Sequence, residues 1–347
     1  MSELLAYVSC ADERAIVTFA MDRTTGALTR RATTKVPGPA GPSMSMPLAL
    51  SPAGGARVLH AAVRLAPYPV SSFEIDLASG ALTRIGGTDL PAAMAYILVD
   101  RSGENLLGAS YPGAILSSTA IDEDNAVTGP TRQIIDTPPR AHAVISDAAG
   151  RYVFVPCLGG DVVLQLELDR QTGQMTQLGR MVTHSGSGPR HMRFAPSGRH
   201  AYVLGELDAK VIACAVDAAG GLSPFQVSAM LPDDVTIPPG GRIAAADIQL
   251  TPDGRFLYAT ERMTNIIFTW SLNPATGAMT AIGQLPSEPG PRAIAIAPGG
   301  NFLLCAGQTS GAIGTYAIDA ATGALTRIAT THAGTNANWI EFFETSS

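Results

Sequence analysis

The sequence contains few charges and no long apolar run. Asp, Glu, Lys and Arg make up 15% of its 347 residues, against about a quarter in an average soluble protein. The net charge of -6 argues against the basic surface that nucleic acids and anionic membranes require. No apolar run reaches the roughly 18 residues of a membrane-spanning helix, and the first residues lack the basic start and apolar core of a signal peptide. These absences predict a soluble, cytoplasmic protein with no nucleic-acid partner and no membrane anchor.

Cysteine pairs and metal-ligand motifs are also missing. The four cysteines, Cys10, Cys157, Cys214 and Cys305, lie far apart inside strand-like segments. None belongs to a CxxC pair or lies beside a histidine in the sequence, so we expect buried free thiols rather than disulfides or zinc ligands. No GxSxG, HExxH or Walker motif occurs. The sequence therefore predicts neither a metal nor a cofactor.

Glycine and proline, in contrast, are abundant, with 36 and 25 residues, which is typical of a chain with many turns. One turn pattern occurs seven times: an Asp or Asn follows an apolar strand, and a small residue, usually Gly, comes four positions later. The polar residues are Asp22, Asp76, Asp122, Asp169, Asp217, Asn273 and Asp319. Because such side chains cap the backbone N–H groups of a hairpin while Gly adopts a positive φ, we predict structural rather than catalytic roles for them.

The spacing of this turn predicts the architecture. The copies lie 46 to 56 residues apart, which is the period of a four-stranded propeller blade. A second turn, seen in LALSPAGG and IAIAPGGN, occurs only six times. We therefore expect the C-terminal segment NANWIEFF to join the blade that LLAYVSC begins, so that the two ends close the ring. No linker divides the chain, and the prediction is one all-β domain over residues 1–347, a seven-bladed β-propeller with four antiparallel strands per blade.

Polar side chains gather at one predicted rim of this ring. The positions eight residues before the glycine of the second turn are Met46, Ala95, His142, Arg190, Ala246 and Arg292. The positions eight residues after it in the later blades are Leu158, Glu206, Arg262 and Gln308. The innermost strand of a blade begins where its antiparallel neighbour ends. The polar members of both sets should therefore surround one mouth of the ring.

Within this rim, Arg190 and Glu206 belong to one hairpin and are expected side by side, as a structural salt bridge or as part of a site. His191 and Asp247 follow rim positions, so strand alternation predicts that they point to the other face and support the site from behind. Asp161 is a candidate for orienting a base or an arginine. Other cations and histidines are predicted at the surface: Arg151, Arg193, Arg199, Arg255, His60, His184, His200 and His332.

The chemistry of such a mouth favours an anionic or carbonyl-bearing ligand. Guanidinium groups bind carboxylate or phosphate through paired hydrogen bonds, and a histidine beside a glutamate offers acid–base groups near neutral pH. Lactone hydrolysis needs a base for water and cations over the developing oxyanion. Lactonising isomerisation needs the same groups to move a proton from carbon.

The sequence resembles the lactonase family of seven-bladed propellers in two segments, GPRHMRFAPSGRHAYVLGELDAKV and GPRAIAIAPGGNFLLCAGQTSGAIGTYAIDAATGAL. That family includes bacterial 6-phosphogluconolactonases and fungal 3-carboxy-cis,cis-muconate lactonizing enzymes. The resemblance covers nearly the whole chain and is strongest from residue 138 onward. It implies that the family's histidine, glutamate and two arginines correspond to His142, Glu206, Arg190 and Arg262, the last by alignment across an insertion around residues 231–242.

The leading hypothesis is metal-independent hydrolysis of a small anionic or sugar-acid lactone. His142 or Glu206 would activate water, and Arg190 and Arg262 would bind the carbonyl oxygen or the ligand anion. The expected substrate-binding residues are Arg292, Gln308, His191, Asp247 and Asp161. One alternative is a lactonising isomerase of muconate-type intermediates that uses the same residues, and another is a non-catalytic binding propeller.

Overall fold

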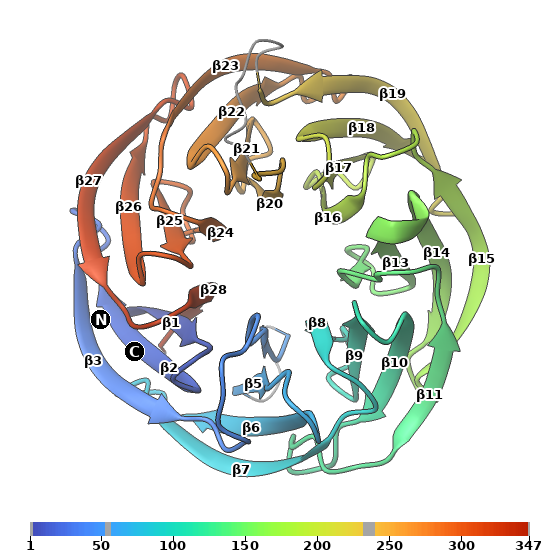
Figure 1. The fold of residues 1–347 in the computed structure, drawn as a ribbon, viewed down its shortest axis with the longest axis vertical. Coiled ribbons are helices and arrows are strands. Elements are labelled where there is room, and N and C mark those ends of the chain that lie inside the picture. The colour runs from blue at the N-terminus through green and yellow to red at the C-terminus, as the bar shows by residue number, and fades with distance from the viewer. Residues whose placement is uncertain (1–2, 53–56, 232–239, 346–347) are drawn as a thin grey trace.

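The computed structural model describes residues 3–52, 57–231 and 240–345. These residues form seven four-stranded sheets, and Figure 1 shows the sheets as blades around a central axis. The predicted seven-bladed β-propeller is therefore confirmed. Most of the insertion predicted around residues 231–242 lies outside the described residues.

Each blade contains four strands, which are named here in order from the axis outward. The blade that holds both chain ends contains β28 (Ala337–Glu344), β1 (Leu4–Cys10), β2 (Ala15–Met21) and β3 (Leu28–Lys35). The next two contain β4 (Leu48–Leu50), β5 (Val58–Ala62), β6 (Pro69–Ile75) and β7 (Leu82–Asp89), and then β8 (Met94–Val99), β9 (Asn105–Ser110), β10 (Ile115–Ala120) and β11 (Thr131–Asp136). The fourth and fifth contain β12 (Ile145–Ser146), β13 (Tyr152–Cys157), β14 (Val162–Asp169) and β15 (Gln174–Val182), and then β16 (Pro189–Phe194), β17 (His200–Gly205), β18 (Lys210–Val216) and β19 (Leu222–Ala229). The last two contain β20 (Ala245–Leu250), β21 (Phe256–Glu261), β22 (Ile266–Leu272) and β23 (Met279–Pro286), and then β24 (Pro291–Ile296), β25 (Phe302–Gly307), β26 (Ala312–Ile318) and β27 (Leu325–His332). A short 3₁₀ turn, η1 (Leu158–Gly160), follows β13, and the described residues contain no helix with the length and apolar character that crossing a membrane requires.

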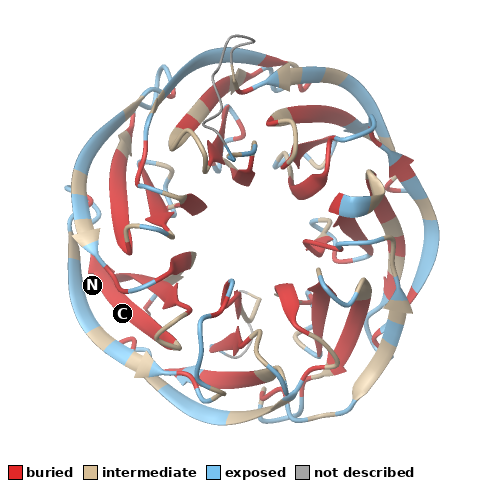
Figure 2. Cartoon of the chain, viewed as in Figure 1, coloured by how far each residue is buried: buried red, intermediate tan, exposed pale blue. Residues whose placement is uncertain are grey.

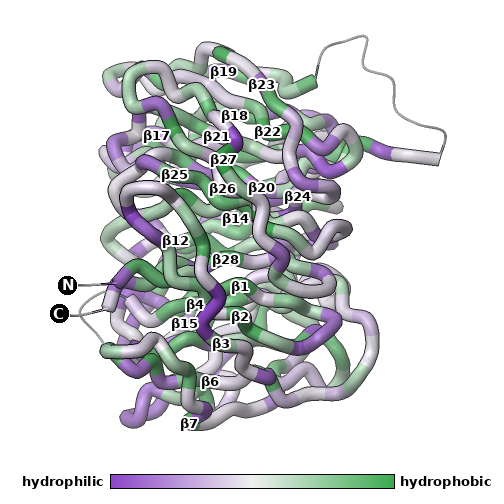
Figure 3. The backbone as a smooth tube through the Cα atoms, turned by 90° about the vertical axis from the view of Figure 1, so that its left-hand side faces the viewer, coloured by the Kyte–Doolittle hydropathy of each residue, from purple (hydrophilic) through white to green (hydrophobic). Residues whose placement is uncertain are grey.

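The two ends of the chain close the ring inside one blade. β28 pairs with β1 in antiparallel register from Leu4↔Glu344 to Cys10↔Ala337. The first and last strands of the chain therefore lie side by side (Figures 1 and 3). The predicted pairing of LLAYVSC with NANWIEFF is confirmed.

The repeated Asp and Asn side chains cap hairpins, as predicted. In each of the seven copies a side-chain oxygen accepts hydrogen bonds from backbone N–H groups two to four residues further on. The hairpin also joins neighbouring blades: the Tyr258 hydroxyl donates to the carbonyl of Gly323 at 2.9 Å. Gly323 has φ +73°, and a Cβ there would lie 2.2 Å from the Phe256 ring. Glycine is therefore required at position 323 both by the positive φ of the turn and by the close approach of the Phe256 ring.

Burial is lowest in the outermost strand of each blade. The second strands are entirely buried and the innermost and third strands largely so, whereas the outermost strands consist mainly of exposed and partly exposed residues (Figure 2). The buried strands are the hydrophobic ones, and polar residues concentrate in the turns (Figure 3). The four cysteines are buried free thiols, as predicted.

Three side chains predicted at the surface are not there. His60 is fully buried on β5, where its Nδ1 lies 2.9 Å from Ser72 Oγ and burial lowers its pKa to about 4. His200 is buried on β17 against Gly277, and Arg193 reaches the central cavity. The first two lie on second strands of blades, which are covered on both faces, so a histidine there is enclosed. The remaining members of that prediction are exposed: Arg151, Arg199, Arg255, His184 and His332.

Candidate active site

The innermost strands surround a cavity of about 430 Å³ along the axis of the ring. Its walls come from β4, β8, β16, β20, β24 and β28 together with the segment before β12. The polar and aromatic side chains that line it are His142, Arg190, His191, Arg193, Asp247, Gln249, Arg292, Asn338, Glu341, Tyr96 and Trp339. The cavity therefore combines several cations with two histidines and few carboxylates.

β-Bulges aim the rim side chains at this cavity. β16 pairs with β17 through Pro189↔Gly205 and then His191↔Leu204, so Arg190 is an extra residue on its strand. The same irregularity makes Arg292 the extra residue of β24. A bulge interrupts the alternation of side chains between faces, and His191 consequently lines the cavity beside Arg190. β20 has an irregularity between Ala245 and Ile248 as well. Both His191 and Asp247 therefore line the cavity, and the prediction that they point away from the mouth is wrong.

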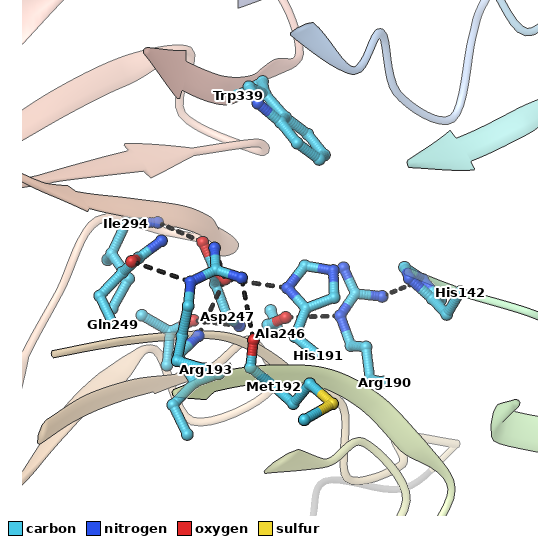
Figure 4. A network of polar contacts seen from close by, with 12 residues as sticks. His142, Arg190, His191, Met192, Arg193, Ala246, Asp247, Gln249, Ile294 and Trp339 are labelled. Atoms are coloured by element: carbon cyan, nitrogen blue, oxygen red, sulfur yellow. Dashed lines mark hydrogen bonds and ion pairs between the residues drawn. The ribbon is translucent and has the colours of Figure 1, made fainter. Parts of the chain in front are cut away.

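Arg190 belongs to a buried polar network, and Figure 4 shows its contacts with His142 and Ala246. Its guanidinium donates to Glu206 Oε2 at 2.8 Å and to the carbonyl oxygen of Ala246 at 2.5 Å. It also contacts His142 Nε2. The other oxygen of Glu206 lies 3.1 Å from Arg262, which in turn donates to the carbonyl oxygen of Ala244. The predicted proximity of Arg190 and Glu206 is confirmed, and Arg262 joins them.

The network fixes the charge of Glu206. Burial alone raises the pKa of this carboxyl group, but Arg190 and Arg262 outweigh burial, so the pKa lies below its ordinary value. Burial lowers the pKa of Arg190 to about 10, with Glu206 opposing the change. At neutral pH the carboxylate is therefore negative and lies between two positive guanidinium groups.

The mouth nevertheless keeps an excess of positive charge. Burial and the neighbouring Arg190, Arg262 and Arg64 hold the pKa of Arg292 well below its usual range. Arg292 donates to Gln308 Oε1 at 3.3 Å, and Arg64 donates to Ser45 Oγ at 2.8 Å. An anionic ligand group would relieve this repulsion. In the described part of the chain, no group of three or more His, Cys, Asp or Glu side chains is arranged to hold a metal ion.

Two histidines stand side by side in the wall of the cavity. The rings of His142 and His191 have centroids 5.3 Å apart and are inclined by 67°. His191 Nδ1 lies 2.8 Å from Asp247 Oδ1, and the other oxygen of Asp247 accepts the backbone N–H of Ile294 at 3.0 Å. Both histidines have pKa values below the ordinary one, with burial as the main cause and Arg190 adding to it.

A second group of polar side chains lies beside the His191–Asp247 pair, with Arg193 4.0 Å from Asp247 Oδ1. Arg193 donates to Gln249 Oε1 at 3.1 Å, and Trp339 Nε1 donates to Glu341 at 2.9 Å. Burial raises the pKa of Glu341 to about 7, although Trp339 and Arg193 oppose the rise. Trp339 faces the Arg190 network from β28 (Figure 4).

Not every predicted site residue lines the cavity. Glu206 and Arg262 stand behind Arg190, and Gln308 bridges Arg292 and the carbonyl oxygen of Met44 at the rim. Asp161 accepts the backbone N–H groups of Gly186 and Gly188 at 2.8 and 2.9 Å. It therefore braces the loop that leads into β16, instead of contacting a base or an arginine as the sequence suggested.

Comparison with known proteins identifies the family. Residues 4–342 match the family model described as "Lactonase, 7-bladed beta-propeller". The chain belongs to the lactonase family of seven-bladed β-propellers. A 6-phosphogluconolactonase of Pectobacterium carotovorum subsp. carotovorum is 34% identical over 274 residues, 78% of each chain. One from Serratia proteamaculans is 33% identical over 258 residues, 74% of this chain and 75% of the other. The solved structure of a periplasmic gluconolactonase from Pseudomonas aeruginosa matches over the full length of both chains with a TM-score of 0.88 at 23% identity, which shows the same fold.

Sequence reasoning missed several polar residues of the site, among them Gln249 and Glu341 in the cavity wall, and Arg64 and Asn338. Arg64 follows β5 outside the eight-residue register, so the repeat contained no signal for it. Asn338 is the bulge residue of β28, because Ser9 pairs with Trp339 and Cys10 with Ala337. Aligning NANW with GPRA would have found Asn338. Its amide oxygen accepts the backbone N–H of Met46 at 3.1 Å, which links β28 to the adjacent blade.

Proposed function

We propose that this chain hydrolyses an anionic sugar-acid lactone, with 6-phosphogluconolactone as the first candidate. The observation that carries the proposal is the excess of buried guanidinium groups at one mouth of a cavity with two histidines in its wall. A cavity of about 430 Å³ has the size of a small-molecule site. The name 6-phosphogluconolactonase of the relative that is 34% identical supports the reaction and the substrate class.

In the proposed reaction a water molecule attacks the lactone carbonyl carbon, and the ring C–O bond breaks to give a hydroxy acid. Arg190 binds the carbonyl oxygen or the ligand anion, and Arg262, which stands behind it against Glu206, adds its positive charge. The oxyanion that forms is stabilised by guanidinium groups already in position. Arg292 and Gln308 bind the anionic substituent or a sugar hydroxyl. His142 and Glu206 are the two candidates that the sequence offers for activating water.

The proposal includes a cytoplasmic location. The four cysteines are free thiols, and disulfides form in oxidising compartments but not in the cytosol. Free thiols therefore favour the cytoplasm.

Proton release measured in weak buffer tests the reaction. The substrates are glucono-1,5-lactone, its 6-phosphate and a muconolactone, each with and without EDTA. We expect acid release above the spontaneous rate, unaffected by EDTA, and fastest with the phosphorylated lactone. Arg190→Gln should abolish it, and Arg199→Gln, a change of an exposed arginine in the same hairpin, should not.

Two results would contradict the proposal. A folded protein that releases no acid from any of these lactones is not a lactonase of this class. Conversion of the muconolactone without net acid release identifies an isomerase instead.

A further inference from the structure

The proposed hydrolysis requires a group that accepts a proton from water, and the two sequence candidates are already occupied. Both oxygens of Glu206 lie against guanidinium groups, at 2.8 Å from Arg190 and 3.1 Å from Arg262. His142 Nε2 contacts the Arg190 guanidinium, which can only donate. His142 Nε2 is therefore the acceptor of that bond, and in the neutral ring the proton lies on Nδ1.

His191 has the opposite proton arrangement. Its Nδ1 faces a carboxylate, Asp247 Oδ1 at 2.8 Å, and an ionised carboxylate can only accept. The proton of the neutral His191 ring therefore lies on Nδ1, and Nε2 keeps its lone pair. His191 Nε2 is a buried atom with no hydrogen-bond partner among the described residues, and the ring to which it belongs lines the cavity.

Asp247 is itself held in place. Its Oδ2 accepts the N–H of Ile294 from the next blade at 3.0 Å, and its own N–H donates to Thr260 Oγ1 at 3.1 Å. Two blades thus fix the carboxylate that fixes the His191 ring. An unpaired buried acceptor costs about 1–3 kcal/mol, so the arrangement is suited to a ligand or a water that donates to Nε2.

The surroundings keep His191 neutral. The charged and titratable groups that face it are Tyr96, His142, Arg190, Arg193 and Asp247. Burial and Arg190 lower the pKa of His191 to about 4, and Asp247 opposes them. Because this pKa lies below neutral pH, the ring is unprotonated and can accept a proton.

We propose that His191 is the general base of the lactone hydrolysis and that Asp247 is its positioning residue; this inference rests on the proposed function. His191 Nε2 takes a proton from water while the water oxygen bonds to the carbonyl carbon and the C=O electron pair moves onto oxygen. The oxyanion collapses, the ring C–O bond breaks, and the leaving oxygen takes the proton from Nε2. Arg190 is the neighbouring residue of the same bulge, so cation and base approach one carbonyl group from adjacent positions.

Kinetics of three variants test the catalytic role with glucono-1,5-lactone and its 6-phosphate. We expect Asp247→Asn and His191→Ala each to lower kcat at least about 100-fold, the range of general-base catalysis, and to change KM little. Added imidazole should restore activity to His191→Ala. His332→Ala, a change of an exposed histidine on the outermost strand β27, should match the wild type. Near-wild-type kcat in either site variant, or a folded His191→Ala that imidazole does not rescue, overturns the inference and leaves the lactonase proposal standing.

A measurement that needs no substrate separates the two proposals. In ¹⁵N NMR spectra of labelled histidine, His191 should carry its proton on Nδ1 at pH 7, and Asp247→Asn should move it to Nε2. A wild-type His191 protonated on Nε2 refutes the inference even if the protein is a lactonase. This readout also covers the case in which His191→Ala does not fold, because Asp247→Asn preserves the size of the side chain.

Discussion

Replacing Glu206 by Gln should destabilise the protein strongly, because the side chain is the negative bridge between two buried cations. The carboxylate is 7% exposed and lies 2.8 Å from Arg190 and 3.1 Å from Arg262. An amide retains one acceptor but no charge, so the two guanidinium groups repel each other without compensation. Breaking a buried ion pair by removing one partner costs about 3–5 kcal/mol. Because the amide keeps one hydrogen bond, we expect a loss of about 3 kcal/mol.

The loss should depend on pH in a defined direction. The pKa of Glu206 is lowered in the folded protein, so its charge stabilises the fold above the unfolded value of about 4.3. That contribution disappears as the pH falls through the lower, folded pKa. The stability difference between wild type and Glu206→Gln should therefore be full at pH 7 and shrink below about pH 4.3.

Urea unfolding at several pH values measures this difference. The matched control is Glu167→Gln, which removes an exposed ion pair with Arg151 at 2.9 Å and should leave stability unchanged, since such pairs contribute little. Inorganic phosphate should restore part of the stability of Glu206→Gln by supplying the missing negative charge. A loss no larger than that of the control, or one independent of pH, refutes the electrostatic account of the mouth.

Three further predictions concern the ligand, the ring and the turns. Arg292→Met removes a cation whose pKa is lowered by burial and by its cationic neighbours, so it should stabilise the fold in urea unfolding. Steady-state kinetics should show a larger rise in KM for the phosphorylated lactone than for glucono-1,5-lactone. Deleting residues 337–347 removes β28, leaves the edge of β1 unpaired and should produce aggregates in gel filtration. Gly323→Ala combines φ +73° with a contact at 2.2 Å, so urea unfolding should show a loss of more than about 1 kcal/mol, whereas Gly283→Ala, with open space around it, should show much less.

The fold could be predicted from the sequence because its signals are local and repeated. Each hairpin carries its own Asp or Asn cap, and the missing seventh copy of the second turn identified the blade that the two chain ends share. Burial of single polar residues was harder to predict. His60 and His200 lie on second strands of blades, and whether a histidine there is enclosed depends on the neighbouring blade, which strand alternation does not include.

At the site, the alternation of side chains between the two faces of a strand no longer predicts which residues point into the cavity. Counting eight residues from each turn reached Arg190 and Arg292, because each of their blades has a bulge at that position. The same bulge invalidates the assumption that the next residue points to the other face, which is why His191 was expected behind the site and lies in its wall. A spacing that repeats across blades can therefore identify the residues at the rim of the ring and still predict the wrong orientation for the residues next to them. In this propeller the misassigned neighbours, His191 and Asp247, form a hydrogen-bonded pair whose buried Nε2 atom has no partner in the part of the chain that the structure describes. A bulge thus supplies two adjacent functional side chains where a regular strand supplies one.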